Sequence, residues 1–238
     1  MREDKTFETL TLPSRGECYP HKKGTIDVAY LTASDENIIF SDKLREEGRM
    51  TDVLLERKIV DKTFTASELC TGDREYILLW LRITGYGKEY HIHDLGGVAT
   101  IDLSDIKFKE FNYFGDADGY FEYLTCRRDS VKYHLLTRSE EKTFTALVAN
   151  PEHRKGENES MRLIKTLLSM ATVSVNGCDD RGEVEMWIDT LEEKELMRYL
   201  SFFCNNNAGV DSHTNHGIEL GDGLFDDIKI SGKLISEE

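Results

Sequence analysis

The sequence lacks any apolar run close to the roughly 20 residues that a transmembrane helix requires. Its first ten residues, MREDKTFETL, are polar, so we expect neither secretion nor membrane insertion. Basic charge is also scarce, because 30 lysines and arginines face 45 aspartates and glutamates and the net charge is −15. Such a charge repels a phosphate backbone, and the basic residues are scattered along the chain. We therefore expect no nucleic-acid partner.

Cysteine pairs are absent as well. The five cysteines are odd in number, far apart in the sequence and never form a C-x-x-C motif: Cys18, Cys70, Cys126, Cys178 and Cys204. This pattern favours free thiols in a reducing compartment over a disulfide or a metal centre.

Signatures of catalysis are missing too. No serine lies in a G-x-S-x-G motif, and no H-E-x-x-H motif occurs. A glycosidase needs only two carboxylates, which keeps cell-wall hydrolysis as an alternative. Among 45 acidic residues, however, a chosen pair is more simply a solvated surface pair. We predict no catalytic residue and no cofactor, and we expect that the chain is not an enzyme.

Two histidine doublets are the only candidates for a metal site. His91 and His93 form HIH, and His213 and His216 form HTNH. Each doublet could hold one face of a zinc ion, with an aspartate close by in the sequence. No complete ligand spacing accompanies either doublet, so surface histidines without metal are the favoured interpretation.

The stretch GDREYILLWLRITGYGKEY, residues 72–90, combines an acidic start, an apolar run and two late glycines. Glycines that hold phosphates precede a helix, whereas Gly85 and Gly87 follow this apolar run. Asp73 stands where a first helical turn favours negative charge. The stretch therefore predicts a helix closed by glycine, followed by a strand, and not a nucleotide-binding loop.

Hydrophobic periodicity along the whole chain predicts an α+β fold with a largely antiparallel sheet. Helices are expected at 34–48, 67–85, 160–172 and 191–205, with the sheet built largely from 88–148 and a short strand at EVEMW before the last helix. The polar stretch 150–160 predicts a loop. Residues 1–149 are then an N-terminal α+β domain with a sheet-rich segment at 88–148, and residues 150–238 a C-terminal helix-strand-helix domain.

The end of the sequence echoes its middle at an offset of 122 residues. This offset places Gly87 on Gly209 and Asp73 on Glu195, and apolar positions match with little identity. Two degenerate similar halves are a hypothesis that this echo raises.

The segment FNYFGDADGYFEYL, residues 111–124, holds six aromatic residues around a D-x-D-G fragment. An EF-hand loop starting at Asp116 would need glutamate at its twelfth position, where Arg127 stands. A hairpin turn with aromatic flanks is the better interpretation. We expect a protein interface at these flanks, made by Tyr113, Phe114, Tyr120, Phe121 and Tyr123.

Three stretches together resemble the baseplate hub and tail assembly proteins of T-even-type bacteriophages: LPSRGECY, TIDVAYLTASDENII and ELCTGDREYILLWLRITGYGKEYHI. The matching positions are Leu12, Pro13, Ser14, Gly16 and Tyr19 in the first, Thr32, Asp35 and Glu36 in the second, and Asp73, Leu81, Arg82, Tyr86, Gly87 and Tyr90 in the third. Residues 10–95 carry the resemblance, and the last third is less similar. The cysteine pair that resembles a zinc ribbon in that family is absent here, and HIHDLGG and HTNHG stand at about those places. Loss of the metal is the favoured interpretation, and a histidine version of the site is the alternative.

The resemblance implies a non-enzymatic structural component of a contractile tail baseplate, in its hub region. Its partners would be other tail and baseplate proteins in a ring-forming or multi-copy assembly, within the virion after assembly in the host cytoplasm. An assembly chaperone absent from the mature particle is the main alternative. A cell-wall hydrolase and a zinc-binding module are further ones. The resemblance gives Pro13, Gly16, Tyr19, Asp73, Arg82, Tyr86 and Gly87 structural roles, and Arg82 is expected to be buried and held by a carboxylate or by carbonyls at a helix end.

Overall fold

A β-hairpin opens the first half of the chain, in a computed structural model that describes residues 6–61, 63–94, 97–150, 152–206, 209 and 222–225. Strands β1 (Phe7–Thr11) and β2 (Thr25–Ala29) pair antiparallel, from Phe7 opposite Ala29 to Thr11 opposite Thr25. Three short helices follow: α1 (Glu36–Ile39), α2 (Asp42–Glu46) and α3 (Met50–Lys58). Ile59 then forms an antiparallel bridge with Val28 on the second strand of the hairpin.

Helix α4 (Thr71–Tyr86) is the long helix of this half. Ile77, Leu78 and Leu81 lie on one side of it and are fully or almost fully buried, as their helical spacing predicts. The helix ends at Gly87 and leads into the antiparallel hairpin β3 (Glu89–Asp94) and β4 (Gly97–Asp102). The predicted closed helix and following strand are therefore confirmed.

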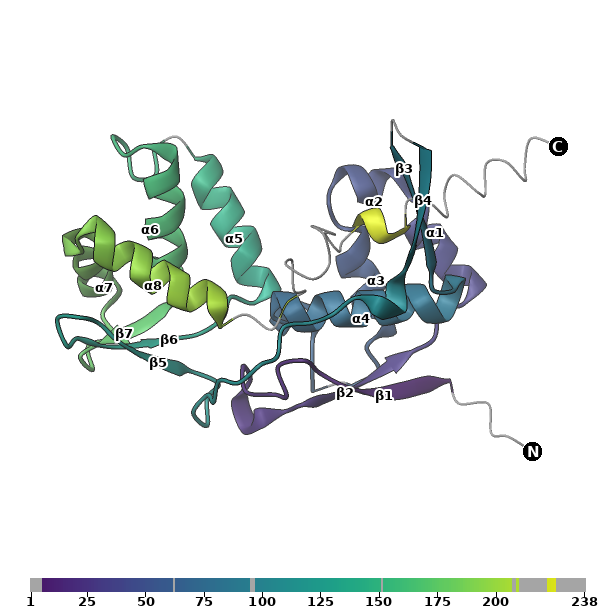
Figure 1. Cartoon of the computed structure of the whole chain (residues 1–238), viewed down its shortest axis with the longest axis horizontal. Coiled ribbons are helices and arrows are strands. Elements are labelled where there is room, and N and C mark those ends of the chain that lie inside the picture. Colours follow the sequence, from purple (N-terminus) through teal and green to yellow (C-terminus); the bar gives the residue numbers. More distant parts are fainter. Residues whose placement is uncertain are drawn as a thin grey trace.

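The second half contains a three-stranded antiparallel sheet in the order β5-β6-β7. Its elements are β5 (Phe121–Leu124), β6 (Ser130–Tyr133), α5 (Arg138–Ala149), α6 (Glu159–Ala171), β7 (Thr172–Val175), α7 (Arg181–Thr190) and α8 (Glu193–Asn205). Figure 1 shows this sheet and helices α6 to α8 on one side of the molecule, and β1 to β4 with α1 to α4 on the other. One hydrophobic core extends through both groups of elements.

The mixed α+β fold with antiparallel sheets is as predicted, but three local predictions are wrong. The segment 138–149 is helix and not strand, because Thr137 and Glu140 form a capping box that starts α5. The expected strand EVEMW lies within α7, which Asp180 caps by accepting from Glu183 N–H. The helix expected at 34–48 is two short helices, because Ser41 caps a new start at α2.

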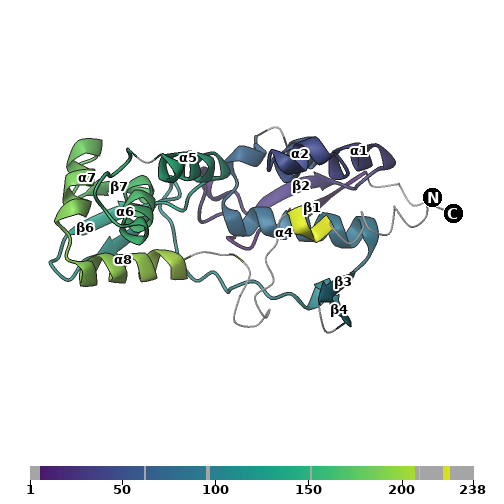
Figure 2. The same ribbon diagram turned by 90° about the horizontal axis from the view of Figure 1, so that it is seen from above.

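The predicted boundary at residues 149 and 150 falls within a packed unit. Strand β6, before it, pairs with β7, after it, with Val131 opposite Val175. Helices α5 and α6, on the two sides of the same boundary, pack against each other. Figure 2 shows the same arrangement from above, with α5 between the two groups of elements.

Part of the order of elements is common to the two halves. Each has an antiparallel hairpin, helices, a third extended segment pairing with the hairpin's second strand, and a long final helix. Helices α4 and α8 begin 122 residues apart, at Thr71 and Glu193. The β3–β4 hairpin and helix α7 have no counterpart in the other half, so the topologies match in part and two degenerate halves stay a hypothesis.

Candidate functional site: the motif loop and the cavity beside it

The loop between β1 and β2, residues 12–24, carries the LPSRGECY motif and closes through its own backbone. Leu12 N–H donates to the Gly24 carbonyl at 2.9 Å, and Tyr19 N–H donates to the Gly16 carbonyl at 3.1 Å. Gly16 has a φ of +84°, and a Cβ atom there would lie 2.5 Å from Gly24 N. Only glycine fits at this crossing of the loop, which explains its place in the motif.

Asp73 anchors this loop to the first turn of α4. Its carboxylate accepts from Ser14 N–H at 2.9 Å, from Ser14 Oγ at 2.5 Å and from Tyr19 OH at 2.7 Å. The Cys70 thiol, 3.5 Å away, is a further donor. The carboxylate is fully buried, so Asp73 does not act as the solvated first-turn acid that its position suggests. Motif residues that stand 59 positions apart thus form one buried cluster.

Burial raises the pKa of the Asp73 carboxyl, and the hydrogen bonds from Ser14 and Tyr19 oppose that rise. Burial also raises the pKa of Tyr19 well above its ordinary value, helped by the negative charge of Asp73. The hydroxyl of Tyr19 stays protonated at neutral pH and remains a donor. The hydrogen bonds among Asp73, Ser14 and Tyr19 make the cluster a structural anchor for the loop.

Arg82 holds the other end of α4. Its Nη1 donates to the Gly87 carbonyl at 2.7 Å, its Nη2 to the Glu89 carbonyl at 3.0 Å and its Nε to the Leu224 carbonyl at 3.1 Å. The side chain is buried, and its guanidinium carbon lies 5.8 Å from the centre of the Tyr86 ring. The prediction that carbonyls at the helix end hold Arg82 is confirmed. Tyr86 and Gly87 belong to the motif because they form this end.

The turn of the aromatic segment, residues 116–120, contacts the motif loop. His21 N–H donates to the Ala117 carbonyl, and Gly115 N–H donates to Glu17 Oε2 at 3.0 Å. A Cβ atom on Gly119 would lie 2.6 Å from the Cys18 carbonyl oxygen, so the two backbones meet where only glycine fits.

Within this turn, Asp116 accepts from the backbone N–H of Asp118 and Tyr120, each at 2.9 Å, and pairs with Lys132 at 2.9 Å. The carboxylate therefore stabilises a turn by binding backbone and lysine donors.

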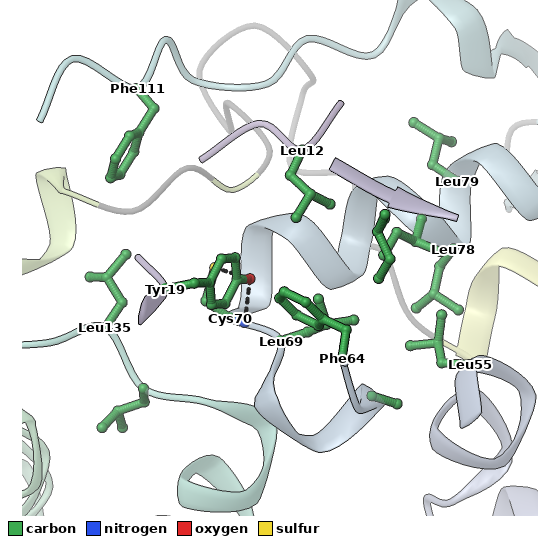
Figure 3. Close-up of a cluster of buried hydrophobic side chains, with 14 of the residues drawn as sticks. Leu12, Tyr19, Leu55, Phe64, Leu69, Cys70, Leu78, Leu79, Phe111 and Leu135 are labelled. Atoms are coloured by element: carbon green, nitrogen blue, oxygen red, sulfur yellow. Dashed lines mark hydrogen bonds between the residues drawn. The ribbon is translucent and has the colours of Figure 1, made fainter. Parts of the chain in front are cut away.

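A cavity of about 620 Å³ lies beside this contact between the two halves. The first half contributes the loop 18–23 and the turn 63–68, and the second contributes residues 118–120 and 134–137. The lining residues used below are Tyr19, Phe64, Tyr120, Leu135, Glu68 and Asp118. Figure 3 shows Tyr19 with Leu135 on one side and Phe64 on the other. The rings of Tyr19 and Phe64 meet edge to face, with centroids 4.8 Å apart.

The predicted aromatic interface is only partly at the surface. Phe114 is 83% exposed, whereas Phe121 is buried and belongs to the core. Tyr123 stacks on Tyr199 of α8 with centroids 4.9 Å apart, and Tyr113 packs edge-on against Phe202. Tyr120 is half-buried in the wall of the cavity. The prediction of five surface aromatics is therefore wrong for Phe121, because β5 places this residue on the sheet face that packs into the core.

The histidine doublets do not come together among the described residues. His91 Nδ1 lies 3.0 Å from Thr100 Oγ1 across the β3-β4 hairpin. The side chain of His93 and all of His213 and His216 lie outside the described parts of the chain. No group of three or more potential ligands gathers among the side chains that the structure describes. All five cysteines are free thiols.

The sequence patterns considered above do not include a capping box that occurs three times in the structure. Thr32 with Asp35, Thr65 with Glu68, and Thr137 with Glu140 all form it, each with a serine in between. The signal is visible as TASD, TASE and TRSE, a threonine followed three residues later by an acid. Two of these boxes, at 65–68 and at 137–140, contribute to the wall of the cavity.

A second acidic anchor matches the first. Glu195, in the first turn of α8, accepts from Cys126 N–H at 2.9 Å and from Tyr123 OH at 3.4 Å. Cys126 follows β5 as Ser14 follows β1, so both halves tie the end of their first strand to the final helix by a carboxylate. The offset that pairs Asp73 with Glu195 in the sequence pairs them in structural role too.

In the described ranges, no helix is long and apolar enough to cross a bilayer. Comparison with known proteins adds no relative: no family model matches the chain, and no curated protein or solved structure is significantly similar to it.

Proposed function

We propose that this protein is a non-enzymatic component of a contractile phage tail baseplate, in the hub region, and acts through contacts with other tail proteins. One observation carries the proposal: the motif residues that resemble the baseplate family build a scaffold. The polar groups of Ser14 and Tyr19 donate hydrogen bonds to the carboxylate of Asp73. The guanidinium of Arg82 donates to three backbone carbonyls. These are the roles that a positioning framework requires, with no reactive group left for a substrate.

The surface of the second half supports a role in protein contacts. Phe114 and Leu124 are 83% and 66% exposed, and both belong to the aromatic segment. Helix α5 has no buried side chain although Phe144, Leu147 and Val148 lie along it half-buried. Apolar side chains of this kind serve as anchors in interfaces. The net charge of −15 favours basic partner surfaces.

Quantitative mass spectrometry of purified tails tests the proposal. A structural subunit should occur at a fixed ratio of roughly three, six or twelve copies per tail, because baseplates are built on closed symmetry. Absence from tails combined with co-purification of baseplate proteins from infected cells would instead identify an assembly chaperone. Absence from both would reject the proposal.

Enzyme activity is tested separately by a zymogram on cell-wall material. The proposal predicts no clearing by the purified chain. Clearing that a single carboxylate or histidine substitution abolishes, without unfolding the protein, would show that the non-enzymatic assignment is wrong.

A further inference from the structure

The cavity beside the motif loop has the size and position of a binding site. Its volume of about 620 Å³ falls within the range of roughly 300–1,000 Å³ that is typical of ligand sites. Its two walls come from different halves of the chain, joined by the backbone contact between Cys18 and Gly119. Anything bound there touches both halves at once.

The interior of the cavity is largely apolar. Tyr19, Phe64, Leu135 and Tyr120 all contribute apolar surface to its lining, and Figure 3 shows Tyr19 between Leu135 and Phe64. Tyr19 offers no free hydroxyl, because its OH is committed to Asp73 and Cys70. This interior favours an aliphatic or aromatic group that loses contact with water on binding.

The titratable side chains of the lining include two carboxylates, one lysine and two histidines. The single lysine of the lining, Lys23, is already paired with Asp61 and Thr63 and lies 5.1 Å from the centre of the Phe64 ring. The imidazole of His134 is bonded to Glu140 at 2.9 Å. His21 is the other basic side chain of the lining.

Two carboxylates of the lining, Glu68 and Asp118, form no ion pair among the described residues; Lys132, which acts electrostatically on Asp118, is itself paired with Asp116 at 2.9 Å. Glu68 accepts only from Thr65, whose N–H and hydroxyl it binds in the capping box, and Asp118 is exposed on its turn. Glu68 comes from the first half of the chain and Asp118 from the second. A cation bound beside them would supply the ion pair that both carboxylates lack among the described residues.

We propose that this cavity binds a basic peptide segment of a partner protein, with a lysine or arginine side chain beside Glu68 and Asp118 and a neighbouring apolar side chain against Tyr19, Phe64 and Leu135. The volume accommodates a few residues of an extended segment. The inference rests on the proposed function only in taking a protein as the partner. Binding across both walls would fix the two halves relative to each other at the moment of assembly.

Nuclear magnetic resonance titration of the uniformly ¹⁵N-labelled full-length chain tests this site. The probes are acetyl-Leu-Arg-Leu-amide and acetyl-Leu-Lys-Leu-amide, compared with acetyl-Leu-Glu-Leu-amide. The basic peptides should produce saturable shifts centred on the amides of Thr63, Gly119 and Thr137, and the acidic peptide should not. Shifts located elsewhere, or equal shifts with the acidic peptide, would refute the site.

A double variant, Glu68→Gln with Asp118→Asn, removes both charges and preserves the shape of the side chains. Glutamine also keeps the capping box. We expect the Kd of the basic peptides to rise about fivefold, as two partly exposed charge pairs would give. The matched control is Glu56→Gln with Asp179→Asn, which changes the net charge equally at two exposed residues that do not line the cavity.

An unchanged Kd in the first variant, or an equal rise in the control, would overturn the proposal. The titration uses the purified chain and no tail particle. A failed titration would therefore not change the result of mass spectrometry on purified tails, which tests the proposed baseplate function. The two proposals can thus fail separately.

Discussion

A single buried carboxylate, Asp73, holds the motif loop on helix α4. Asp73→Ala would leave Ser14 N–H, Ser14 Oγ and the Tyr19 hydroxyl without their acceptor in a buried site. Hydrogen bonds to charged groups contribute about 1.5–3 kcal/mol each, and the losses overlap within one cluster. We expect the free energy of unfolding in urea to fall by about 3 kcal/mol.

Glu56→Ala is the control for this measurement. Glu56 is exposed on α3, and its removal should change the stability by no more than about 0.5 kcal/mol. If the Asp73 variant behaved like this control, the carboxylate could not be the anchor of the loop.

Arg82 joins three segments through one planar group. Arg82→Lys keeps the positive charge but replaces the guanidinium by a single ammonium group. The ammonium cannot donate to the carbonyls of Gly87, Glu89 and Leu224 in the same planar geometry. The stability should fall by about 2 kcal/mol, seen as a lower melting temperature in a calorimetric scan. Arg128→Lys, at an exposed position, should leave the melting temperature nearly unchanged. An unaltered melting temperature combined with lost assembly would give Arg82 a direct role in binding instead.

Glu140 makes part of the stability dependent on pH. Burial alone would raise its pKa, but the hydrogen bonds from His134 and Thr137 lower the pKa from 4.5 to about 2. A carboxyl whose pKa is depressed in the folded state stabilises the fold above its unfolded pKa. That contribution is lost as the pH falls from about 4.5 toward about 2.

The stability difference between the wild type and Glu140→Gln should therefore be larger at pH 6 than at pH 3, as measured by urea unfolding at both values. A difference that does not depend on pH would mean that the pair with His134 contributes nothing through its charge.

Helix α5 buries the least of the longer helices that the structure describes, although Arg138 and Lys142 pair with Asp52 of α3. None of its side chains is buried, whereas α4 buries Ile77, Leu78 and Leu81. Amide hydrogens on weakly packed elements exchange through low-energy local opening. Hydrogen exchange followed by mass spectrometry should show deuterium entering α5 at least ten times faster than the centre of α4. Equal protection of the two helices would indicate that α5 is covered by contacts that its exposure does not reveal.

Helices with unambiguous end signals could be predicted from the sequence, and α4 is the clearest example. An acid-led start, a regular apolar face and a closing glycine predict a helix at 67–85, and the structure has it at 71–86 because Ala66–Glu68 form a separate 3₁₀ turn. Helices α5 and α7 were missed because β-branched and alternating residues, as in KTFTALV and EVEMW, suit strands locally. Their capping residues, Thr137 and Asp180, decide the outcome.

The sequence motif identifies residues of the buried cluster in the candidate site, but it does not predict how their side chains are arranged in space. The motif grouped Ser14, Tyr19 and Asp73, yet nothing in the sequence shows that their side chains share one buried cluster. The cavity depends on the turn 116–120 reaching the loop 18–23, a contact between segments about 100 residues apart. Short-range patterns carry no information on such a contact.

Over the whole molecule, the two sides of the 149/150 position depend on each other. A fragment of residues 1–149 would lack β7, the partner of β6, and would expose Tyr133, which is fully buried against Tyr199 and Phe203 of α8. We expect the fragment alone to lose its near-ultraviolet circular dichroism, and to regain it when residues 150–238 are added. A native spectrum from the isolated fragment would show that the division at 149/150 separates independent domains after all.

The matching anchors at Asp73 and Glu195 have a consequence for how this molecule can be specialised. Where two separate, identical copies associate, every substitution appears on both sides of their contact at once. If the two halves are similar units joined in one chain, each can change alone: Asp73 binds Ser14 and Tyr19, whereas Glu195 binds Cys126, Tyr123 and Arg198. Such a chain has a polarity that a symmetric pair lacks, so its two ends can face different neighbours.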